Sequence, residues 1–326
     1  MRILVTGGLG VNGCWVTRDL LTMGHEPVVF DNRPDFTLLR DVSDEFAFVQ
    51  GDITSLEQLD RACKEHRIER ICHLAAVYPD TADADPLLGF SVNALATVYV
   101  LEAAKRNGID RVSFTSSIGA LSRMTEEHLE PQMVPVNEDF PAYPMSSVYG
   151  AAKTASELMG IQYKRLFGID FAAMRFAAIY GIGKGAERHG SHNMIWGELI
   201  RSAIAGRPIV IPQGGDQRLD LTYARDVAQS VVKGCLVDSF EGHVFHIGSG
   251  RTYTLNDFAD AIRKVIPGAQ VEVGPGFDPR GMGPLAYYSL DINRARRELG
   301  YEPQYPPEAA IRDWLEWTER LELTEG

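Results

Sequence analysis

The first thirteen residues, Met1-Arg-Ile-Leu-Val-Thr-Gly-Gly-Leu-Gly-Val-Asn-Gly13, determine how the rest of the chain is interpreted. The apolar run 3–5 predicts a short buried strand, and Gly7, Gly10 and Gly13 follow it at the spacing GxxGxxG. Beyond the glycines, the apolar residues of 16–23 recur with the period of a helix. This order of strand, tight turn and helix is typical of a βα unit that binds a dinucleotide.

The glycines give this turn the chemistry of an anion-binding site. Gly7 lets the chain reverse after the strand, Gly10 lets backbone N–H groups approach a pyrophosphate, and Gly13 lets the helix pack close to the strand. The phosphates would then lie at the positive end of the helix. A second predicted strand, 27–30, ends at Asp31, where a carboxylate would accept hydrogen bonds from an adenosine ribose. The alternative is an ordinary βα turn followed by a solvated Asp31.

Composition restricts the partners of the protein. The chain has 326 residues, 45% of them hydrophobic and 23% charged, as in a soluble globular protein of one large or two moderate domains. The formal net charge of −12 argues against a sequence-blind grip on nucleic acid or on an anionic membrane, because both need a basic face. We therefore expect a small-molecule substrate, and an anionic one would be held by a few local cations and backbone amides.

Cysteine usage and apolar runs indicate where the protein works. Cys14, Cys63, Cys72 and Cys235 include no CxxC pair and no spaced His partners, so we expect buried reduced thiols and neither a metal site nor disulfides. The first predicted strand begins at residue 2, which leaves no room for a signal peptide, and no apolar run approaches membrane-spanning length. These features favour a cytoplasmic protein.

Strand and helix patterns alternate up to about Phe176, which predicts an α/β fold with a doubly wound parallel sheet. After the two strands above, strands are predicted over 46–49, 70–74, 112–115 and 171–176, and helices over 55–66, 86–106 and 149–166. Later elements are predicted over 193–205, 208–211, 226–236 and 244–247, and a helix with a tryptophan stripe ends the chain. We assign 1–176 to a Rossmann domain and 177–326 to a smaller α/β substrate domain, with 219–247 returning to the first domain.

Polar residues follow several of these strands, and parallel topology would bring them to one edge of the sheet. They are Thr6, Asp31, Asp52 and Ser116-Ser117, and the pair Ala75-Ala76 follows a strand in the same way. Asp52 would hold an adenine amino group while Ile53 packs on the ring, or Asp52 simply begins a helix. Asn93, inside the long predicted helix, reaches either the cofactor or a neighbouring carbonyl.

Tyr149 and Lys153 form a candidate catalytic pair. They are four residues apart at the start of a predicted helix, so their side chains project from one face. An ammonium at this spacing would lower the pKa of the phenol and make it a usable base near neutral pH. Ser117, at the end of a neighbouring strand, would hold the substrate oxygen while Tyr149 takes or gives the proton.

These motifs resemble the extended short-chain dehydrogenase/reductases, also called the NAD-dependent epimerase/dehydratase family. The resemblance covers nearly the whole chain and rests on the segments Thr6–Gly13, Gly51–Ile53, His73–Ala76, Phe114–Ser117, Tyr149–Lys153, Asp278–Gly281, Asp291 and Glu298–Pro303. The family implies a Rossmann domain that binds NAD, a substrate domain, and hydride transfer between a secondary alcohol and the nicotinamide. It implies that Tyr149 is the acid/base, that Lys153 also holds the nicotinamide ribose, and that Ser117 orients the alcohol.

The resemblance also supplies a set of cofactor contacts. The expected residues are Gly7, Gly10, Val11, Asn12, Gly13, Asp31, Asn32, Asp52, Ile53, Leu74, Ala75, Ala76, Asn93, Tyr149 and Lys153. A carboxylate at Asp31 would repel a 2′-phosphate and so favours NAD over NADP, although Arg33 could pair with that phosphate.

Departures from the family pattern bear on the substrate. The Asp-Glu pair of sugar-nucleotide dehydratases is missing beside Ser117, which disfavours water elimination. The strand Arg175-Phe176-Ala177-Ala178 lacks the Asn that nucleotide-sugar epimerases place on it. Arg218 stands one position early, and a one-residue shift on a strand would turn it to the opposite face.

The expected substrate contacts are nevertheless those of a sugar-nucleotide enzyme. They are Tyr78, Ser117, Asn193, Arg218 and Arg280. Lys184, Arg188, His189 and His192 add cations to the same loop, unless they are solvated loop charges. The stretch 122–146 is long enough to act as a lid, and nothing in it is diagnostic.

The leading interpretation is an NAD-dependent oxidoreductase of a sugar-like secondary alcohol, most similar to a nucleotide-sugar epimerase. A net dehydrogenase of a non-nucleotide alcohol, sugar or sugar acid is the alternative, and a non-catalytic NAD-binding protein is the third. Family habit predicts a homodimer formed through the helices near 90–106 and 149–166. The sequence does not name the substrate.

Overall fold

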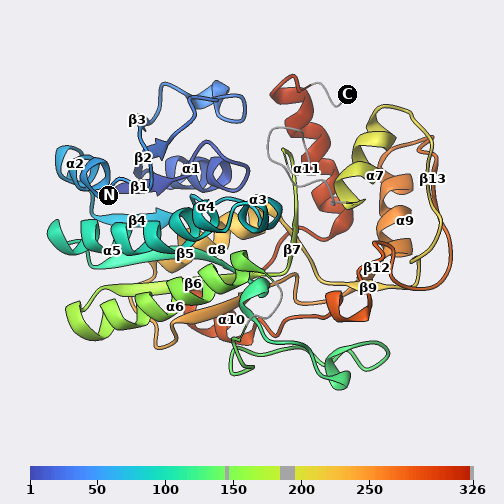
Figure 1. The fold of residues 1–326 in the computed structure, drawn as a ribbon. Coiled ribbons are helices and arrows are strands. Elements are labelled where there is room, and N and C mark those ends of the chain that lie inside the picture. Colours follow the sequence, from blue (N-terminus) through green and yellow to red (C-terminus); the bar gives the residue numbers. More distant parts are fainter. Residues whose placement is uncertain (144–146, 184–194, 324–326) are drawn as a thin grey trace.

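A seven-stranded parallel sheet forms the centre of the computed structural model, which describes residues 1–143, 147–183 and 195–323 (Figure 1). The sheet order is β11-β6-β5-β4-β1-β2-β3. Its strands are β1 (Arg2–Thr6), β2 (Glu26–Asp31), β3 (Ala47–Gln50), β4 (Arg70–His73), β5 (Arg111–Ser117), β6 (Asp170–Phe176) and β11 (Val244–Ile247). The predicted doubly wound α/β fold is therefore confirmed.

Helices cover both faces of this sheet (Figure 1). The helices α2 (Leu56–Glu65), α5 (Ala96–Arg106) and α6 (Val148–Phe167) pack on one face, while α1 (Gly13–Thr22) and α8 (Ala224–Leu236) pack on the other. Fully buried Leu4 belongs to the first core and fully buried Ile3 and Val5 to the second, because successive strand residues point to opposite faces.

The strand order reverses between β1 and β4, which lie side by side in the middle of the sheet. From this point the chain winds outward in both directions, and in sheets of this kind ligands bind outside the carboxyl ends of the strands at the switch point. The glycine turn follows β1, and residues 74–78 follow β4. The sheet thus places the predicted cofactor residues at its switch point.

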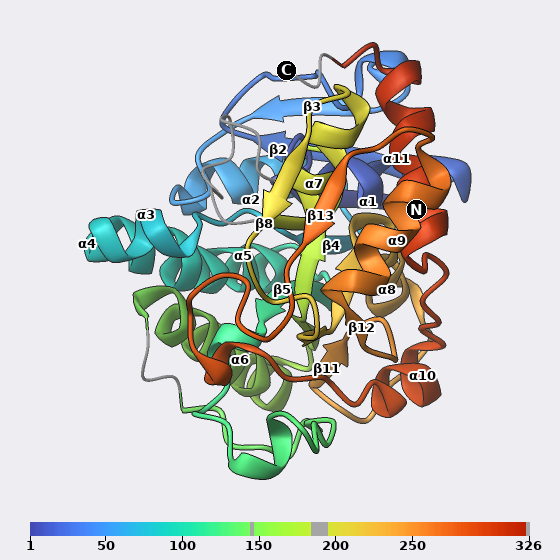
Figure 2. The same ribbon diagram turned by 90° about the vertical axis from the view of Figure 1, so that its right-hand side faces the viewer.

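The C-terminal part adds three two-stranded sheets and several helices beside this edge (Figure 2). The strand pairs are β7 (Ala178–Tyr180) with β10 (Leu221–Tyr223), β9 (Arg218–Leu219) with β12 (Tyr253–Thr254), and β8 (Ile209–Ile211) with β13 (Val271–Val273). The helices are α7 (Ile195–Ile204), α9 (Leu255–Val265), α10 (Asn293–Leu299) and α11 (Pro307–Arg320).

Helix α11 returns to the Rossmann part of the molecule. Its Trp317 ring lies 5.0 Å from the Trp15 ring of α1, edge to face, and the Arg18 guanidinium lies 4.4 Å from the Trp317 ring. The predicted tryptophan stripe is therefore core packing. The segment 219–247 contributes β11 to the main sheet and α8 to the helices that cover it. The domain boundary at residue 176 stays a prediction.

The predicted helix over 86–106 is interrupted. It consists of α4 (Pro86–Phe90), a π turn (Ser91–Leu95) and α5, and a short helix, α3 (Pro79–Ala84), precedes it. By length and composition the stretch Pro86–Arg106 could cross a membrane, which corrects the expectation that no run approaches that length. Half of its most apolar window is buried inside the protein, as in a core helix, so this is weak evidence for a membrane span.

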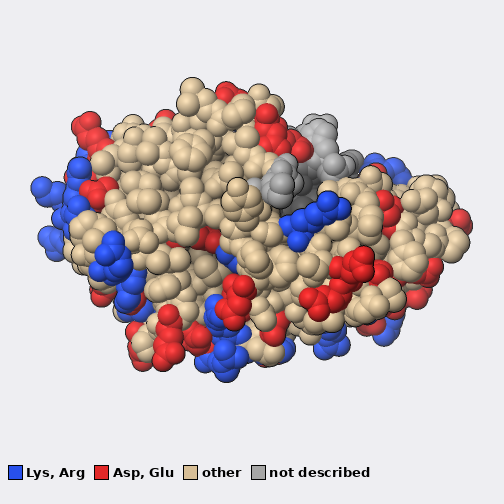
Figure 3. All heavy atoms as spheres, turned by 60° about the horizontal axis from the view of Figure 1, so that its bottom comes forward, with Lys and Arg blue, Asp and Glu red and all other residues tan. Residues whose placement is uncertain are grey.

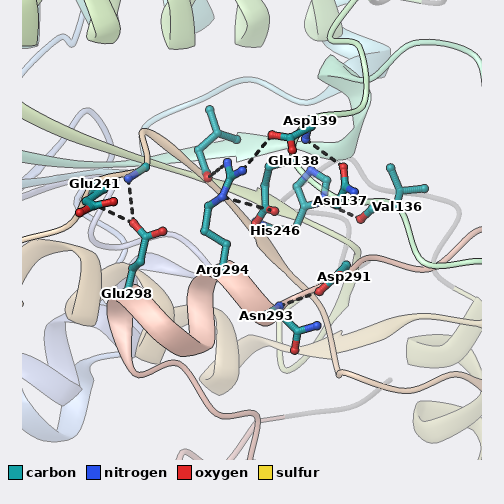
Figure 4. A network of polar contacts seen from close by, with 12 residues as sticks. Val136, Asn137, Glu138, Asp139, Glu241, His246, Asp291, Asn293, Arg294 and Glu298 are labelled. Carbon is teal, nitrogen blue, oxygen red and sulfur yellow. Dashed lines mark hydrogen bonds and ion pairs between the residues drawn. The ribbon is translucent and has the colours of Figure 1, made fainter.

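The described part of the stretch 122–146 is tied to the C-terminal part of the chain. Val136 forms a bridge with Leu290, and its carbonyl lies 2.9 Å from Nδ1 of His246 on β11 (Figure 4). Arg294 of α10 pairs with Asp139 at 2.9 Å (Figure 4). These contacts join the segment to β11, to α10 and to the chain around Leu290.

Charged side chains are mixed on the surface. Acidic and basic groups lie interspersed over the face shown in Figure 3. The cysteines, Cys14, Cys63, Cys72 and Cys235, are all free and buried.

Candidate active site

The glycine turn is shaped by close backbone contacts. Gly7 has φ of +67°, and a Cβ there would lie 2.8 Å from the Cα of Ala75 in the loop after β4. A Cβ on Gly13 would lie 2.2 Å from the carbonyl oxygen of Gly7. Both positions therefore require glycine, as the spacing predicted. A Cβ on Gly10 would meet only the Gly7 oxygen, at 3.1 Å. The fold itself therefore tolerates a side chain at Gly10 better than at the other two glycines, and the missing Cβ mainly leaves the backbone open to a ligand.

The start of α1 offers polar groups to an anion. Asn12 is the N-cap residue, and its side chain makes no capping bond. Its Oδ1 is buried and has no hydrogen-bond partner within the described ranges. The first turn of α1 carries no acidic residue, so the positive end of the helix is not neutralised there. These features fit a dinucleotide phosphate, and neighbouring Val11 is buried.

Asp31 ends β2 beside this turn. Its carboxylate accepts hydrogen bonds from the backbone N–H groups of Leu9 and Arg33, each at 3.2 Å. Burial raises the pKa of Asp31, and the two backbone bonds oppose this effect. The exposed Asn32 follows, with its carbonyl bonded to the side chain of Gln50. The carboxylate thus borders the turn where an adenosine ribose is expected.

The end of β4 is joined to the end of β1 through Thr6. The Thr6 hydroxyl accepts hydrogen bonds from the N–H groups of Leu74 and Ala75 at 3.2 and 3.3 Å. It also lies 2.7 Å from Nδ1 of His73. Leu74 and Ala75 are half-buried and Ala76 is exposed, and Ala75 lies against Gly7, so this loop borders the glycine turn.

Three further predicted contacts have local partners. Asp52 accepts hydrogen bonds from the backbone and hydroxyl of Thr54, which places it in the turn before α2. Ile53 is buried in the core cluster that includes Leu59. The amide of Asn93 donates to the carbonyl of Val77 at 3.0 Å and accepts from its N–H at 2.9 Å. Asn93 therefore holds the loop after β4, and direct contacts of these residues with a cofactor stay predictions.

Ser117, Tyr149 and Lys153 meet at the carboxyl end of β5. Ser117 ends this strand, its hydroxyl accepts a hydrogen bond from Gly119 N–H at 3.0 Å, and it lies near enough to Tyr149 to lower the pKa of that phenol. The Lys153 ammonium lies 5.5 Å from the Tyr149 ring and donates to the carbonyl of Thr115 at 2.7 Å. The arrangement can hold and protonate the oxygen of a carbonyl compound.

The pKa values differ from the expectation that Lys153 lowers that of Tyr149. Burial raises the pKa of Tyr149 to about 12, with a further rise from nearby Tyr78, and Ser117 opposes both. Burial also lowers the pKa of Lys153 to about 7. The spacing of four residues correctly suggests proximity, but burial, and not the charge of Lys153, has the largest effect on the pKa of Tyr149.

The candidate substrate pocket is a small cavity that is lined in part by Ile118, the residue after Ser117. It is lined by Trp196, Leu219, Asp220, Arg280, Tyr287 and Tyr288, among others. Its volume is about 30 Å³, which is enough for a water molecule or two. The Arg280 Nε is buried and has no hydrogen-bond partner among the residues that the structure describes, which fits an anionic ligand.

The structure does not bring all the expected substrate residues to this cavity. Arg218 pairs with Glu130, with 2.6 Å between Nη2 and Oε2, and also donates to the carbonyl of Pro131. Its neighbours Leu219 and Asp220 line the cavity instead, as the one-residue displacement implies. Asn193 lies outside the described residues, as do Lys184, Arg188, His189 and His192.

Other groups at the site were not predicted from the sequence. Asp220 is buried and accepts hydrogen bonds from the backbones of Ser249 and Leu290. Trp196 lies with its ring 5.9 Å from the Arg280 guanidinium. Nothing in the local sequence marks these residues, because their partners are distant in the chain. No group of three or more His, Cys, Asp or Glu side chains suited to a metal ion occurs in the described part of the chain.

Comparison with known proteins decides the family. Residues 3–248 match the model of the NAD dependent epimerase/dehydratase family. The chain belongs to this family.

Curated relatives and solved structures agree with the family assignment. The chain is 31% identical over 309 residues to a UDP-glucose 4-epimerase of Mycolicibacterium smegmatis, covering 93% of this chain and 94% of the relative. A Thermus thermophilus UDP-glucose 4-epimerase, solved in complex with NAD, is 26% identical with a TM-score of 0.79, covering 98% and 99% of the two chains. A Thermotoga maritima UDP-glucose 4-epimerase at 24% identity shares the fold, with a TM-score of 0.81 and coverage of 98% and 99%.

Membership of the NAD-dependent epimerase/dehydratase family confirms the resemblance drawn from the motifs and makes the protein an enzyme of the extended short-chain dehydrogenase/reductase type. NAD is the cofactor of this family. The close backbone contacts of the glycine turn, the unpartnered Oδ1 of Asn12 among the described residues, and the position of Asp31 beside the turn are compatible with such a cofactor.

Proposed function

We propose that the protein is an NAD-dependent nucleotide-sugar epimerase that inverts a secondary alcohol by oxidation and reduction. The observation that carries this proposal is the meeting of Ser117, Tyr149 and Lys153 at the sheet edge that also holds the glycine turn. The unpartnered Nε of Arg280 in the adjoining cavity supports an anionic substrate. The 31% identity to a UDP-glucose 4-epimerase supports a sugar diphosphate as that anion.

NAD would be held by the glycine turn, Asn12 and Asp31, with Lys153 on its nicotinamide ribose. When bound, it supplies the hydride acceptor and donor. The carboxylate of Asp31 favours NAD over NADP because it would repel a 2′-phosphate. Its bonds to Leu9 and Arg33 hold it at the end of β2, facing the glycine turn.

The residues of this chain would move and hold the proton. Ser117 Oγ holds the reacting oxygen of the substrate, the phenolate of Tyr149 takes the proton during oxidation, and the resulting phenol returns it during reduction. Lys153, as an ammonium, stabilises the phenolate that is present before the oxidation and again after the reduction. Its bond to the Thr115 carbonyl keeps it beside the Tyr149 ring.

A net dehydrogenase of a non-nucleotide alcohol or sugar acid is the second candidate. Arg218 forms an ion pair with Glu130. Ala178, which lines the cavity, stands at the position where nucleotide-sugar epimerases have an Asn. These two departures reduce the number of side chains that could hold a diphosphate. A third candidate, an NAD-binding protein without catalysis, has less support, because a binding module does not need a serine, a phenol and an amine in contact.

One incubation separates these candidates. The purified protein with NAD is mixed with UDP-glucose or UDP-galactose, and both isomer formation and absorbance of NADH are followed. The epimerase predicts isomer formation without accumulating NADH. Steady NADH release with a non-nucleotide sugar or sugar acid, and no isomerisation of any UDP-sugar, would assign the second candidate, while no turnover with either would leave the third.

We also propose a homodimer formed through the helices around α4, α5 and α6. Leu87 and Phe90 of α4 are 80% and 50% exposed, and Leu158 and Leu166 of α6 are 57% and 55% exposed. Large apolar side chains exposed together on neighbouring helices suit an isologous interface. Light scattering should give twice the chain mass for the native protein and the chain mass for Leu158→Glu; a monomeric native protein would contradict the proposal.

A cytoplasmic location is also proposed, in keeping with the four free cysteines.

A further inference from the structure

A buried ion pair lies beneath the candidate catalytic residues and has no part in the mechanism above. Glu157 follows Lys153 by one helical turn and Tyr149 by two on α6, so the three side chains share one face. Its carboxylate accepts hydrogen bonds from Arg175 Nε at 2.8 Å, Arg175 Nη2 at 2.6 Å and the Ser116 hydroxyl. Glu157 and Arg175 are each 3% exposed.

This ion pair connects α6 to the strand ends that carry the other groups of the site. Ser116 on β5 is paired in register with Arg175 on β6. Ser116 directly precedes Ser117, and it directly follows Thr115, whose carbonyl accepts the hydrogen bond from Lys153. A single carboxylate therefore fixes the helix relative to the strand that presents both Ser117 and the partner of Lys153.

Stability alone is a weak reason for such a pair. A buried ion pair loses much of its Coulomb energy to desolvation, and well-packed apolar side chains often stabilise a core as well. Its position next to a buried amine suggests a different role.

The Thr115 carbonyl and two aromatic rings favour the ammonium form of Lys153, but among the described residues that act on its pKa only Glu157 brings a negative charge. From β4 it faces His73, which is neutral because burial, with a smaller effect of Lys153 itself, lowers its pKa to about 3. From β5 it faces the Phe114 ring at 4.6 Å, and from its own helix the Tyr149 ring. Arg175 on β6 adds a positive charge that is already paired with Glu157. Burial lowers the pKa of Lys153 to about 7, and the Glu157 carboxylate opposes that effect.

We infer that Glu157 is a positioning residue whose carboxylate keeps Lys153 in its ammonium form and holds α6 against the ends of β5 and β6. The inference builds on the proposed function, in which an ammonium stabilises the phenolate of Tyr149. Its direct consequence, the charge of Lys153, can be measured in the protein without substrate.

The test is an NMR titration of Lys153 in full-length protein labelled with ¹⁵N-lysine, with the signal assigned by Lys153→Arg. In Glu157→Gln we expect the titration midpoint of Lys153 to fall by about one pH unit relative to the native protein, since a nearby carboxylate charge is removed. Glu157→Asp keeps the carboxylate charge, so its Lys153 midpoint should lie close to that of the native protein. If the proposed function holds, the alkaline limb of the pH–kcat profile moves by the same amount.

Two further variants make the test specific. Asp170→Asn removes a carboxylate paired with Arg111 at the opposite ends of the same two strands, so it should leave the Lys153 midpoint unchanged. Should Glu157→Gln fail to fold because it leaves Arg175 unpaired, Glu157→Gln with Arg175→Met removes both charges and should still lower the midpoint. A native-like midpoint in folded Glu157→Gln or in the double variant, or an equal shift in Asp170→Asn, overturns the inference. An unmoved alkaline limb of the pH–kcat profile with the NMR shift intact would instead contradict the proposed function.

Discussion

Alanine at two glycines of the first turn should separate folding from cofactor binding. At Gly13 a Cβ would lie 2.2 Å from the Gly7 oxygen and 2.6 Å from the Gly8 Cα, both of which are backbone atoms. No rotamer change relieves such a contact, so the backbone must open by about 0.8 Å to reach 3.0 Å. We expect Gly13→Ala to lose about 1–3 kcal/mol of unfolding free energy, as overpacked cores do.

Gly10→Ala should behave differently. Its Cβ meets only the Gly7 oxygen, at 3.1 Å, and Gly10 is not among the glycines with positive φ, so we expect its stability to change by less than about 1 kcal/mol. The added methyl group occupies the space in which a pyrophosphate would approach the backbone. We therefore expect the Kd for NAD to rise at least tenfold, which corresponds to about 1.4 kcal/mol.

Both variants are measured in the same two assays, urea unfolding and calorimetric titration with NAD. Gly24→Ala serves as a control for the methyl group itself, because Gly24 has open space around it and lies at the far end of α1. Its positive φ predicts a modest loss of stability and no change in NAD affinity. Native NAD affinity in Gly10→Ala would refute the placement of the phosphates, and native stability in Gly13→Ala would refute the close packing of the turn.

Three further predictions test individual side chains. Burial raises the pKa of Asp19 from 3.8 to about 6, so its ionised form destabilises the folded state; Asp19→Asn should stabilise the protein by about 1–2 kcal/mol at pH 8, and urea unfolding should show this gain disappearing as the pH falls from about 6 to below 4. Arg280→Met should raise KM for an anionic substrate about tenfold or more with little change in Tm, because the Arg280 Nε is unpartnered among the described residues; an unchanged KM in initial-rate measurements would remove Arg280 from the site. Glu130→Gln should lower Tm by a few degrees through loss of the Arg218 pair while NAD affinity stays native, and calorimetry would contradict this if NAD binding weakened.

Local patterns were sufficient for the frame of the fold and for the central residues of the site. The apolar runs and the glycine spacing predict β1, its turn and α1, because strand period, helix period and the need for glycine are properties of neighbouring residues. The pairing of Tyr149 with Lys153 follows from helix geometry in the same way.

Features that depend on distant residues could not be predicted. Arg218 is 88 residues from Glu130, and no local signal indicates that the two form an ion pair. Glu157, four residues after Lys153, does have a local signal, namely the same helical spacing that joins Tyr149 and Lys153. The raised pKa of Tyr149 also comes from burial by the whole fold, which spacing alone does not report.

The central claim is that the Tyr149 hydroxyl carries the proton in a reaction that the bound cofactor completes, and one comparison of rates tests it directly. Tyr149→Phe is compared with Tyr163→Phe, which removes a phenol of the same helix that is bonded to Glu102, away from the site. With the substrate found in the incubation above, we expect Tyr149→Phe to lower kcat by about 10²–10⁴-fold with NAD affinity within about twofold of native, and Tyr163→Phe to keep native kcat. Native kcat in Tyr149→Phe would contradict the account.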